Sequence, residues 1–460
     1  MKDFFDTIAA IATPPGKGSL SVIKISGSKA IEYAQKCFIT KIGKEKDLRQ
    51  LDRKLLYGYA VDPNNRTVID ECILLTMLAP KSYTGEDVVE FQCHGGNISS
   101  YKIIKALFAL GARQAAPGEF TLRAFLNGKK DLLQAEAVNA LVSSSNEFLH
   151  KNALLQLKGS LSERLESVFE ELRRHYIALE ADINFPEDVS YENSEEIYTL
   201  LDKAQEILKG LEKSYLDTAP LREGIKAIIL GKPNVGKSTF LNKVLDYERA
   251  IVTPQPGTTR DFIVEQINFC GLPIHLIDTA GIRETDDPVE KIGIEKTISL
   301  LSEAEVVFLI LDTSAALTHD DDRLINLLGK HKKALVLCLL NKIDKGNCID
   351  ETKLPPSFLV SKVSLKTGEG FESFKELFRK QILNLYELDD KEEVHITLPR
   401  HYEVVKTMLN ITEGLLSEPH SLDRLLFGLK ELITCYDNLL GKTLPPDEIE
   451  QIFSTFCIGK

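Results

Sequence analysis

The segment GKPNVGKS, residues 231–238, fits the pattern Gly-x4-Gly-Lys-Ser/Thr and decides the fold of the middle of the chain. It follows the apolar run 226–230, which predicts a buried strand, and it precedes a helical pattern. Glycines let backbone N–H groups curl around phosphate oxygens, and the N-terminus of the next helix adds positive potential. In such a loop Lys237 reaches the β- and γ-phosphates of a nucleotide, and the Ser238 hydroxyl is a ligand of Mg²⁺.

Four later motifs complete the pattern of a GTP site, and NKID among them selects guanine as the base. DTAG at 278–281 follows the strand predicted at 274–277, so that Asp278 can hold Mg²⁺ through water and the Gly281 N–H can meet the γ-phosphate. NKID at 341–344 follows another strand, and the Asp344 carboxylate can accept two hydrogen bonds from guanine, which adenine cannot supply. SLK at 364–366 fits a last base-contacting loop, and Thr259 in GTTRD (257–261) supplies a further oxygen for Mg²⁺. The predicted nucleotide contacts are Asn234, Val235, Gly236, Lys237, Ser238, Thr239, Thr253, Thr258, Thr259, Asp278, Gly281, Asn341, Lys342, Asp344, Ser364 and Lys366.

Strands and helices alternate from about residue 225 to 385, which predicts a mostly parallel sheet with helices on both faces. The predicted strands are 226–230, 263–269, 274–277, 306–311, 334–340 and 358–360. Residues 1–122 read as mixed α/β, with strands near 19–25, 71–78 and 88–93 and a helix at 99–110. Residues 123–181 and 401–460 are helical, and Asn184-Phe185-Pro186 ends the first helical stretch. The expected fold class is therefore multidomain α/β and α, with domains at 1–122, 123–221, 222–385 and 386–460, the third inserted into a helical domain.

Composition places the chain among soluble globular proteins. Its 460 residues suggest about three domains, 43% are apolar, and no run of 18 apolar residues could span a membrane. The net charge of −12 argues against non-specific coating of nucleic acid. Residues 1–122 carry 16 basic and 13 acidic side chains, so the charge does not exclude nucleic-acid binding through this segment. The 8 cysteines include no Cys-x-x-Cys pair, which favours a reducing cytoplasm over a disulfide scaffold or a zinc site.

One position in the GTP motifs departs from Ras-like enzymes. Those enzymes place a glutamine directly after the DTAG-type motif to orient the attacking water, whereas this chain has Ile282. An isoleucine cannot orient water. Either hydrolysis is very slow, or another group supplies this function.

The GTP motifs resemble the translation-factor class of P-loop GTPases, and the flanking motifs resemble the tRNA modification GTPase family MnmE (TrmE). The matching segments are ATPPGKG (12–18), ISG (25–27), SYTGED (82–87), HGG (94–96), APGEF (116–120), RAFLNGK (123–129), QAEA (134–137) and IFSTFCIGK (452–460). The resemblance spans the whole chain. It implies a folate-binding and dimerising N-terminal domain, a helical domain and an inserted Ras-like GTPase domain. It also implies a cytoplasmic homodimer that works with a flavin-containing partner, MnmG (GidA), and places an aminomethyl-type group on carbon 5 of the wobble uridine of certain tRNAs.

The resemblance further implies a site for a tetrahydrofolate derivative, in the 5-formyl or the 5,10-methylene form. The family's folate contacts fall on Lys24, Glu90, Lys129 and Lys460, and Lys24 departs from the family's usual arginine, losing its bidentate fork. Cys457 lies in the terminal motif, where the family places a cysteine near the folate pocket, as nucleophile, acid or packing residue. The ending CIGK does not suit prenylation, because Gly459 is not aliphatic and Lys460 is a disfavoured last residue.

For hydrolysis, the resemblance implies that a potassium ion acts where other GTPases use an arginine. The matching ligands are Asn234, Thr253, Gln255 and Thr258. A cation against the β- and γ-phosphate oxygens supplies charge neutralisation, and Glu290 takes over the orientation of water.

Two other classes of function remain open. An Era-like switch would bind RNA or ribosomes without modifying them, but residues 386–460 contain no Gly-x-x-Gly RNA-binding loop. A folate-dependent aminomethyltransferase that acts on a protein and carries a regulatory GTPase insert is not excluded by the sequence.

Overall fold

The computed structural model describes residues 6–41, 47–185, 194–247, 265–277, 301–330, 333–386, 393–417 and 421–460. The chain forms two compact units. Unit 1 comprises Met1–Ser143, Ala153–Leu208 and Glu403–Lys460, and unit 2 comprises Ser144–Asn152 and Lys209–Tyr402. The domain boundaries predicted at 122, 221 and 385 remain predictions.

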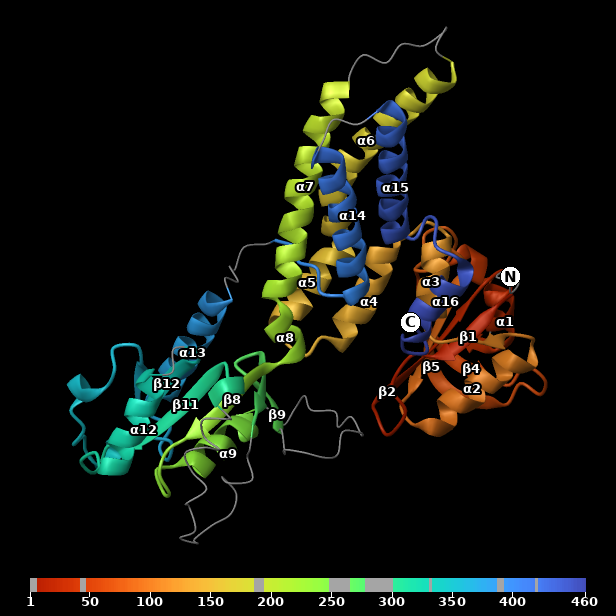
Figure 1. Cartoon of the computed structure of the whole chain (residues 1–460). Coiled ribbons are helices and arrows are strands. Elements are labelled where there is room, and N and C mark those ends of the chain that lie inside the picture. The colour runs from red at the N-terminus through yellow and green to blue at the C-terminus, as the bar shows by residue number, and fades with distance from the viewer. Residues whose placement is uncertain are drawn as a thin grey trace. The chain divides into compact units, whose positions relative to one another are not determined.

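A seven-stranded sheet forms the N-terminal part of unit 1. Its order is β3-β4-β5-β6-β2-β1-β7, and only the β1–β7 pair is parallel. α1 and α2 cover one face of this sheet (Figure 1), where Ile23, Leu74 and Phe91 are buried. The elements are β1 (Ile8–Ile11), β2 (Leu20–Ser26), α1 (Ala30–Lys36), β3 (Phe38–Thr40), a 3₁₀ turn (Leu48–Gln50), β4 (Leu55–Val61), β5 (Val68–Met77), β6 (Val88–His94), α2 (Asn97–Ala109) and β7 (Arg113–Gln114).

Helices make up the remainder of unit 1. α6 packs along α15, where Arg173 donates to both Asp437 carboxylate oxygens (3.1 and 2.7 Å) and Phe169 stacks on Tyr436. The helices are α3 (Glu119–Leu126), α4 (Leu132–Ser143), α5 (Glu147–Lys158), α6 (Ser160–Asn184), α7 (Ser194–Asp217), α14 (Pro399–Ser417), α15 (Leu422–Leu440) and α16 (Pro446–Ser454), of which α5, α7 and α14 contribute residues to both units. α6 ends at Asn184, as the break before Pro186 predicts.

Unit 2 has the predicted architecture of a mostly parallel sheet with helices on both faces. The strand order is β13-β12-β11-β8-β10-β9, and only β9 is antiparallel to its neighbour. Alternate residues of β11 enter two separate cores: Phe308 packs with Phe240 of α9 and Phe374 of α13, whereas Leu309 packs with Leu328 of α12. The elements are α8 (Ala219–Glu223), β8 (Ile225–Leu230), α9 (Lys237–Tyr247), β9 (Glu265–Phe269), β10 (Leu272–Leu276), β11 (Val306–Asp312), α12 (His319–Lys330), β12 (Leu335–Asn341), two 3₁₀ turns (Ile343–Lys345, Glu351–Lys353), β13 (Leu359–Val363) and α13 (Phe371–Leu385).

Among the described residues, no helix is both long enough and apolar enough to cross a membrane.

Candidate nucleotide site and the C-terminal cluster

The phosphate loop lies between β8 and α9, as the pattern predicts. Gly231 and Gly236 have φ angles of +147° and +112°, which side chains rarely adopt. A Cβ on Gly231 would lie 2.4 Å from the Ile310 carbonyl oxygen, and one on Gly236 would lie 2.4 Å from Asn341 Nδ2. Both positions therefore require glycine, and the loop is held against β11 and β12.

The charged and hydroxyl groups of this loop lie at the start of α9. Lys237 Nζ donates to the Gly231 carbonyl oxygen at 2.7 Å, so the ammonium group folds back over the loop. Ser238 and Thr239 are exposed in the first turn of α9. A phosphate at this helix N-terminus would meet backbone N–H groups and a lysine, and the hydroxyl oxygen of Ser238 suits a hard cation such as Mg²⁺.

Asn341 joins three loops on the guanine side of the site. Its Nδ2 donates to the Val235 carbonyl oxygen at 2.7 Å, and its Oδ1 accepts from the Leu365 N–H at 2.9 Å. The side chain is buried, so both contacts are shielded from water. The phosphate loop and the SLK loop are thereby fixed relative to each other.

Lys342 makes a second connection to the phosphate loop. Its Nζ donates to the Asn234 carbonyl oxygen at 2.8 Å and to Asp312 Oδ2 at 2.5 Å. Asn234 itself has a φ of +63°, in the left-handed region. Burial raises the pKa of Asp312, but the hydrogen bonds from Lys342 and Ser314 outweigh it and lower the pKa overall. Sequence reasoning missed Asp312, which follows a buried strand as the other site residues do.

Asp344 is exposed and in position to accept from a base. Ser364 Oγ donates to Asp344 Oδ1 at 2.7 Å, and this hydrogen bond lowers the pKa of the carboxyl group. The carboxylate is therefore ionised at neutral pH and keeps further lone pairs for a ligand. Lys366 lies two residues beyond Ser364 on the same loop and is exposed.

Several predicted residues lie outside the described part of the chain. They are Thr253, Gln255, Thr258, Thr259, Asp278, Gly281 and Glu290. Of the predicted metal ligands, the structure thus places Asn234 and Ser238. In the described residues, no group of three or more His, Cys, Asp or Glu side chains could hold a metal ion.

In unit 1, three of the four residues implied in folate binding lie together. Lys24 of β2 and Glu90 of β6 are cross-strand partners whose Nζ and Oε1 atoms are 3.8 Å apart. Burial lowers the pKa of Lys460, the nearby charge of Lys24 lowers it further, and Cys457 acts in the opposite direction. The structure thus places Lys24, Glu90, Lys460 and Cys457 near one another. Lys129 instead donates to the Pro80 carbonyl oxygen at 3.1 Å.

The C-terminal segment 457–460 is held by the turn that begins α3. The Gly118 N–H donates to the Cys457 carbonyl oxygen at 3.3 Å, and the Phe120 N–H donates to the Lys460 oxygen at 3.1 Å. Gly459 has a φ of +92°, and a Cβ there would lie 2.8 Å from Ala12 Cα. Cys457 is exposed, which contradicts the packing interpretation of its thiol.

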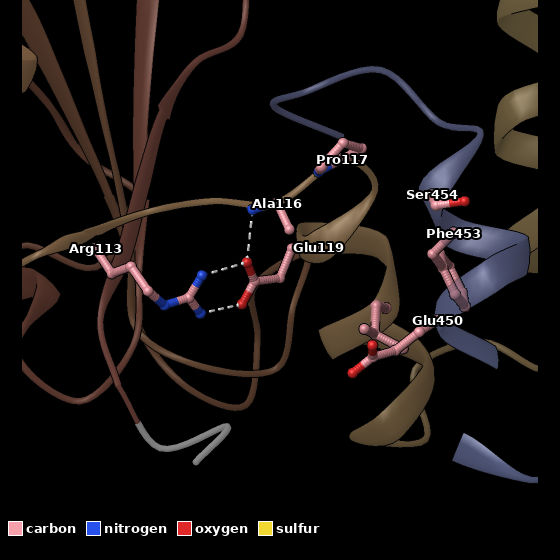
Figure 2. Close-up of a pocket in the computed structure, with 8 residues that line it drawn as sticks. Arg113, Ala116, Pro117, Glu119, Glu450, Phe453 and Ser454 are labelled. Atoms are coloured by element: carbon pink, nitrogen blue, oxygen red, sulfur yellow. Dashed lines mark hydrogen bonds and ion pairs between the residues drawn. The ribbon is translucent and has the colours of Figure 1, made fainter. Parts of the chain in front are cut away.

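A buried ionic cluster supports this turn. Arg123 is 1% exposed and donates to Asp6 Oδ1 (2.6 Å), to Glu119 Oε1 (3.0 Å) and to both oxygens of Glu86 (3.1 and 3.2 Å). Figure 2 shows that Arg113 donates to both oxygens of the Glu119 carboxylate, and Glu119 also accepts from the Ala116 N–H at 2.7 Å. The sequence motifs APGEF and RAFLNGK contain Glu119 and Arg123, whose i,i+4 spacing pairs them on a helix, but the helical region was predicted to begin only at residue 123.

Two family models match the chain. One, described as the GTP-binding protein TrmE N-terminus, matches residues 7–129, and the other, the MnmE helical domain, matches residues 132–457. Curated proteins named tRNA modification GTPase MnmE are 40% identical in Clostridioides difficile (strain 630), 40% in Caldicellulosiruptor saccharolyticus and 38% in Geobacter sulfurreducens. These alignments cover 99% of this chain and 99%, 100% and 99% of the relatives. Among solved structures, the G domain of the T. maritima FeoB iron transporter matches 35% of this chain and 98% of its own, with 24% identity and a TM-score of 0.25.

Proposed function

The chain belongs to the MnmE family of tRNA modification GTPases, and on that premise we propose that it hydrolyses GTP with Mg²⁺ while adding an aminomethyl-type group to carbon 5 of the wobble uridine of certain tRNAs. The observation that carries this proposal is the guanine side of the site. Asn341 holds the base-binding loops together, and Asp344, ionised and hydrogen-bonded to Ser364, presents a carboxylate that only guanine complements. The same chain matches MnmE relatives over 99% of its length.

Two cation sites are proposed at and after the phosphate loop, one for Mg²⁺ and one for K⁺. Ser238 and Thr259 would hold Mg²⁺, which neutralises charge on the β- and γ-phosphates. Asn234, with Thr253, Gln255 and Thr258, would hold K⁺. The main-chain carbonyl of Asn234 accepts from Lys342, which holds the backbone of this ligand in the loop.

Potassium dependence gives this part of the proposal its test. GTP turnover should be much faster in KCl than in NaCl at equal ionic strength, because no cis arginine of the described site is available to neutralise the developing charge. Glu290→Ala should leave GTP affinity nearly unchanged and slow hydrolysis by about 10²-fold or more, as expected for a lost water-orienting group. Equal turnover in the two salts would remove the potassium assignment, and normal turnover of the variant would move the role of Glu290 to another residue.

The modification site is proposed at the C-terminal cluster. Lys24, Glu90 and Lys460 offer two cations and one carboxylate to a tetrahydrofolate derivative, and the exposed Cys457 lies near Lys460. Lys129, which donates to Pro80 instead, is proposed as a further contact on the family resemblance alone. Cys457→Ser should abolish tRNA modification and leave GTP turnover unchanged, because serine hardly ionises where a thiol can. Full modification by this variant would show that the thiol has no chemical role.

We further propose that the chain acts in the cytoplasm as a homodimer with a flavin-containing partner, MnmG. Expression of the chain in a bacterial strain that lacks its own MnmE should restore the modified wobble uridine, measured by mass spectrometry of nucleosides from total tRNA. Asp344→Asn serves as the matched negative control. If the chain binds and hydrolyses GTP but restores no modified nucleoside, it acts as a GTPase switch and not as a modification enzyme.

A further inference from the structure

Two segments of the N-terminal unit lack acidic residues altogether. Residues 7–31 and 91–118 contain no Asp or Glu, although the chain as a whole has 68 acidic residues and a net charge of −12. The first segment carries Lys17, Lys24 and Lys29, and the second carries Lys102, Lys105 and Arg113. β2 lies in the first segment, and part of β6 lies in the second. The two strands pair, with Leu20 opposite His94, so the two segments are adjacent in the sheet.

A glycine-rich loop lies against the turn that begins α2. The Gly16 N–H donates to Asn97 Oδ1 at 3.2 Å, and the Gly95 N–H donates to the Ser19 carbonyl oxygen at 3.2 Å. A Cβ on Gly95 would lie 1.9 Å from the Gly18 oxygen, so only glycine allows this approach. Residues 14–19 are all exposed, which places Lys17 on the surface beside the start of α2.

α2 has one buried face and one exposed face, and the exposed face carries lysines and a tyrosine but no carboxylate. Ile103, Ile104 and Leu107 pack on the sheet. The exposed positions 98, 101, 102 and 105 follow helical spacing and bring Ile98, Tyr101, Lys102 and Lys105 to the outside of the helix. Tyr101 is 53% exposed, and Lys105 Nζ lies 4.6 Å from the centre of its ring. The helix itself contains no acidic side chain to pair with either lysine.

One carboxylate outside the two segments, Asp70, lies near the start of α2 but is already engaged. It accepts from the His94 N–H at 3.1 Å and lies 2.8 Å from His94 Nδ1. The hydrogen bond to Asp70 raises the pKa of His94 and favours the protonated imidazole. The positive charge of that imidazole balances the negative charge of Asp70. The positive charge of Lys17, Lys102 and Lys105 is therefore not cancelled by this group.

We propose that the exposed face of α2 and the loop of residues 14–19, together called the α2 surface, bind the tRNA that the chain modifies. Ammonium groups contact phosphates, and an exposed tyrosine ring can stack on an unpaired base. Among the described residues, no atom lies within 4 Å of a Cβ placed on Gly16 or Gly96, so a sugar–phosphate backbone can approach the main chain closely there. An exposed tyrosine also occurs in protein interfaces, so the test below includes binding of the flavoprotein partner. This proposal rests on the proposed function, because it takes tRNA as the substrate.

The test measures binding of the full-length chain to a fluorescently labelled tRNA transcript with uridine at the wobble position. Lys102→Gln/Lys105→Gln should weaken binding about tenfold or more near 0.1 M salt and reduce the slope of log K against log salt by about 2, since two phosphate contacts are lost. Tyr101→Ala should weaken binding about fivefold or more, and Tyr101→Phe should retain the parental affinity because the ring is kept. The matched control, Lys41→Gln/Lys54→Gln, removes two exposed charges elsewhere in the same unit and should bind as the parent does.

Each outcome bears on a different claim. Parental affinity and salt slope in the α2 variants would overturn the α2 surface while leaving the proposed function intact. Equal weakening in the α2 variants and the control would reduce the effect to net charge and also overturn it. Unchanged tRNA binding together with lost binding of the flavoprotein partner would assign the surface to a protein. If the parental chain binds no tRNA, alone or with that partner, the proposed function fails with it.

Discussion

Both polar atoms of the Asn341 side chain are used within the protein, and this explains why a motif can predict a residue without predicting its role. The sequence places Asn341 after a buried strand and suggests a contact with the nucleotide. In the structure its amide bridges Val235 and Leu365, residues 106 and 24 positions away. A local pattern can identify the residue, but a contact across such distances depends on how the strands of the sheet are ordered.

Asp344 leads to a prediction about base preference. Asp344→Asn replaces an acceptor-only carboxylate by an amide that can also donate, so the match to the guanine amino group is lost and a match to the C2 carbonyl of xanthine is gained. GTP affinity should fall about tenfold or more, and xanthosine triphosphate affinity should rise. Titration of the two nucleotides by fluorescence measures both constants.

Ser364→Ala is the control for this substitution. It removes the hydroxyl that donates to Asp344 and leaves the carboxylate in place. This variant should bind GTP more weakly without gaining affinity for xanthosine triphosphate. A gain by the alanine variant would mean that the loop, and not the chemistry of residue 344, sets base preference.

Among the elements, those made of continuous apolar runs were predictable and those with local exceptions were not. The strands predicted at 226–230, 306–311 and 334–340 are confirmed within one or two residues, because they are buried runs of apolar side chains. β4 (Leu55–Val61) was missed. Its Gly58 suggests a break, yet a Cβ at that position would lie 2.1 Å from the Ile39 oxygen of β3, so the glycine serves strand pairing.

The sequence motifs at the start of α3 were identified, but the ionic cluster that their side chains form was not predicted. Arg123→Ala should lower the free energy of unfolding of unit 1 by about 3–5 kcal/mol, because it leaves the buried carboxylate of Glu119 with one cation fewer. Arg173→Ala, which breaks a less buried pair with Asp437 (side chains 26% and 13% exposed), should cost less, about 1–2 kcal/mol. Denaturant unfolding of both variants compares them, and equal losses would show that the cluster contributes no more than this single pair.

Acid should weaken the same cluster. Burial raises the pKa of both Asp6 and Glu119, but their hydrogen bonds to Arg113 and Arg123 outweigh it and lower both values. At mildly acidic pH the unfolded chain therefore binds more protons than the folded one, so the stabilisation is present above the ordinary carboxyl pKa of about 4 and is lost as the pH falls below it. Unfolding followed between pH 6 and pH 3 should show a smaller loss in Arg123→Ala than in the parental chain. Parallel pH profiles would exclude the cluster as the source of acid sensitivity.

At the scale of the whole molecule, the two proposed sites lie in different units. Sequence order already separated them, since the GTP motifs fall at 231–366 and the residues proposed to contact folate at 24–129 and 460. The family resemblance groups Lys460 with Lys24, which are 436 positions apart, but no pattern in the residues themselves indicates that they lie near each other. That association depends on the segment 457–460 binding the turn before α3.

Because the sites lie in separate units, nucleotide hydrolysis and tRNA modification can be tested for coupling with one variant. If hydrolysis drives the modification, Asp344→Asn should lose both activities together in limiting GTP and regain both in xanthosine triphosphate, since only the identity of the base has changed. Cys457→Ser should behave in the opposite way, with normal turnover of GTP and no modified uridine. The measurement is nucleotide turnover and modified nucleoside in the same reaction, with the flavoprotein partner, the folate and tRNA present. Xanthosine triphosphate that restores turnover but not modification, or full modification without turnover, would show that the two units work independently.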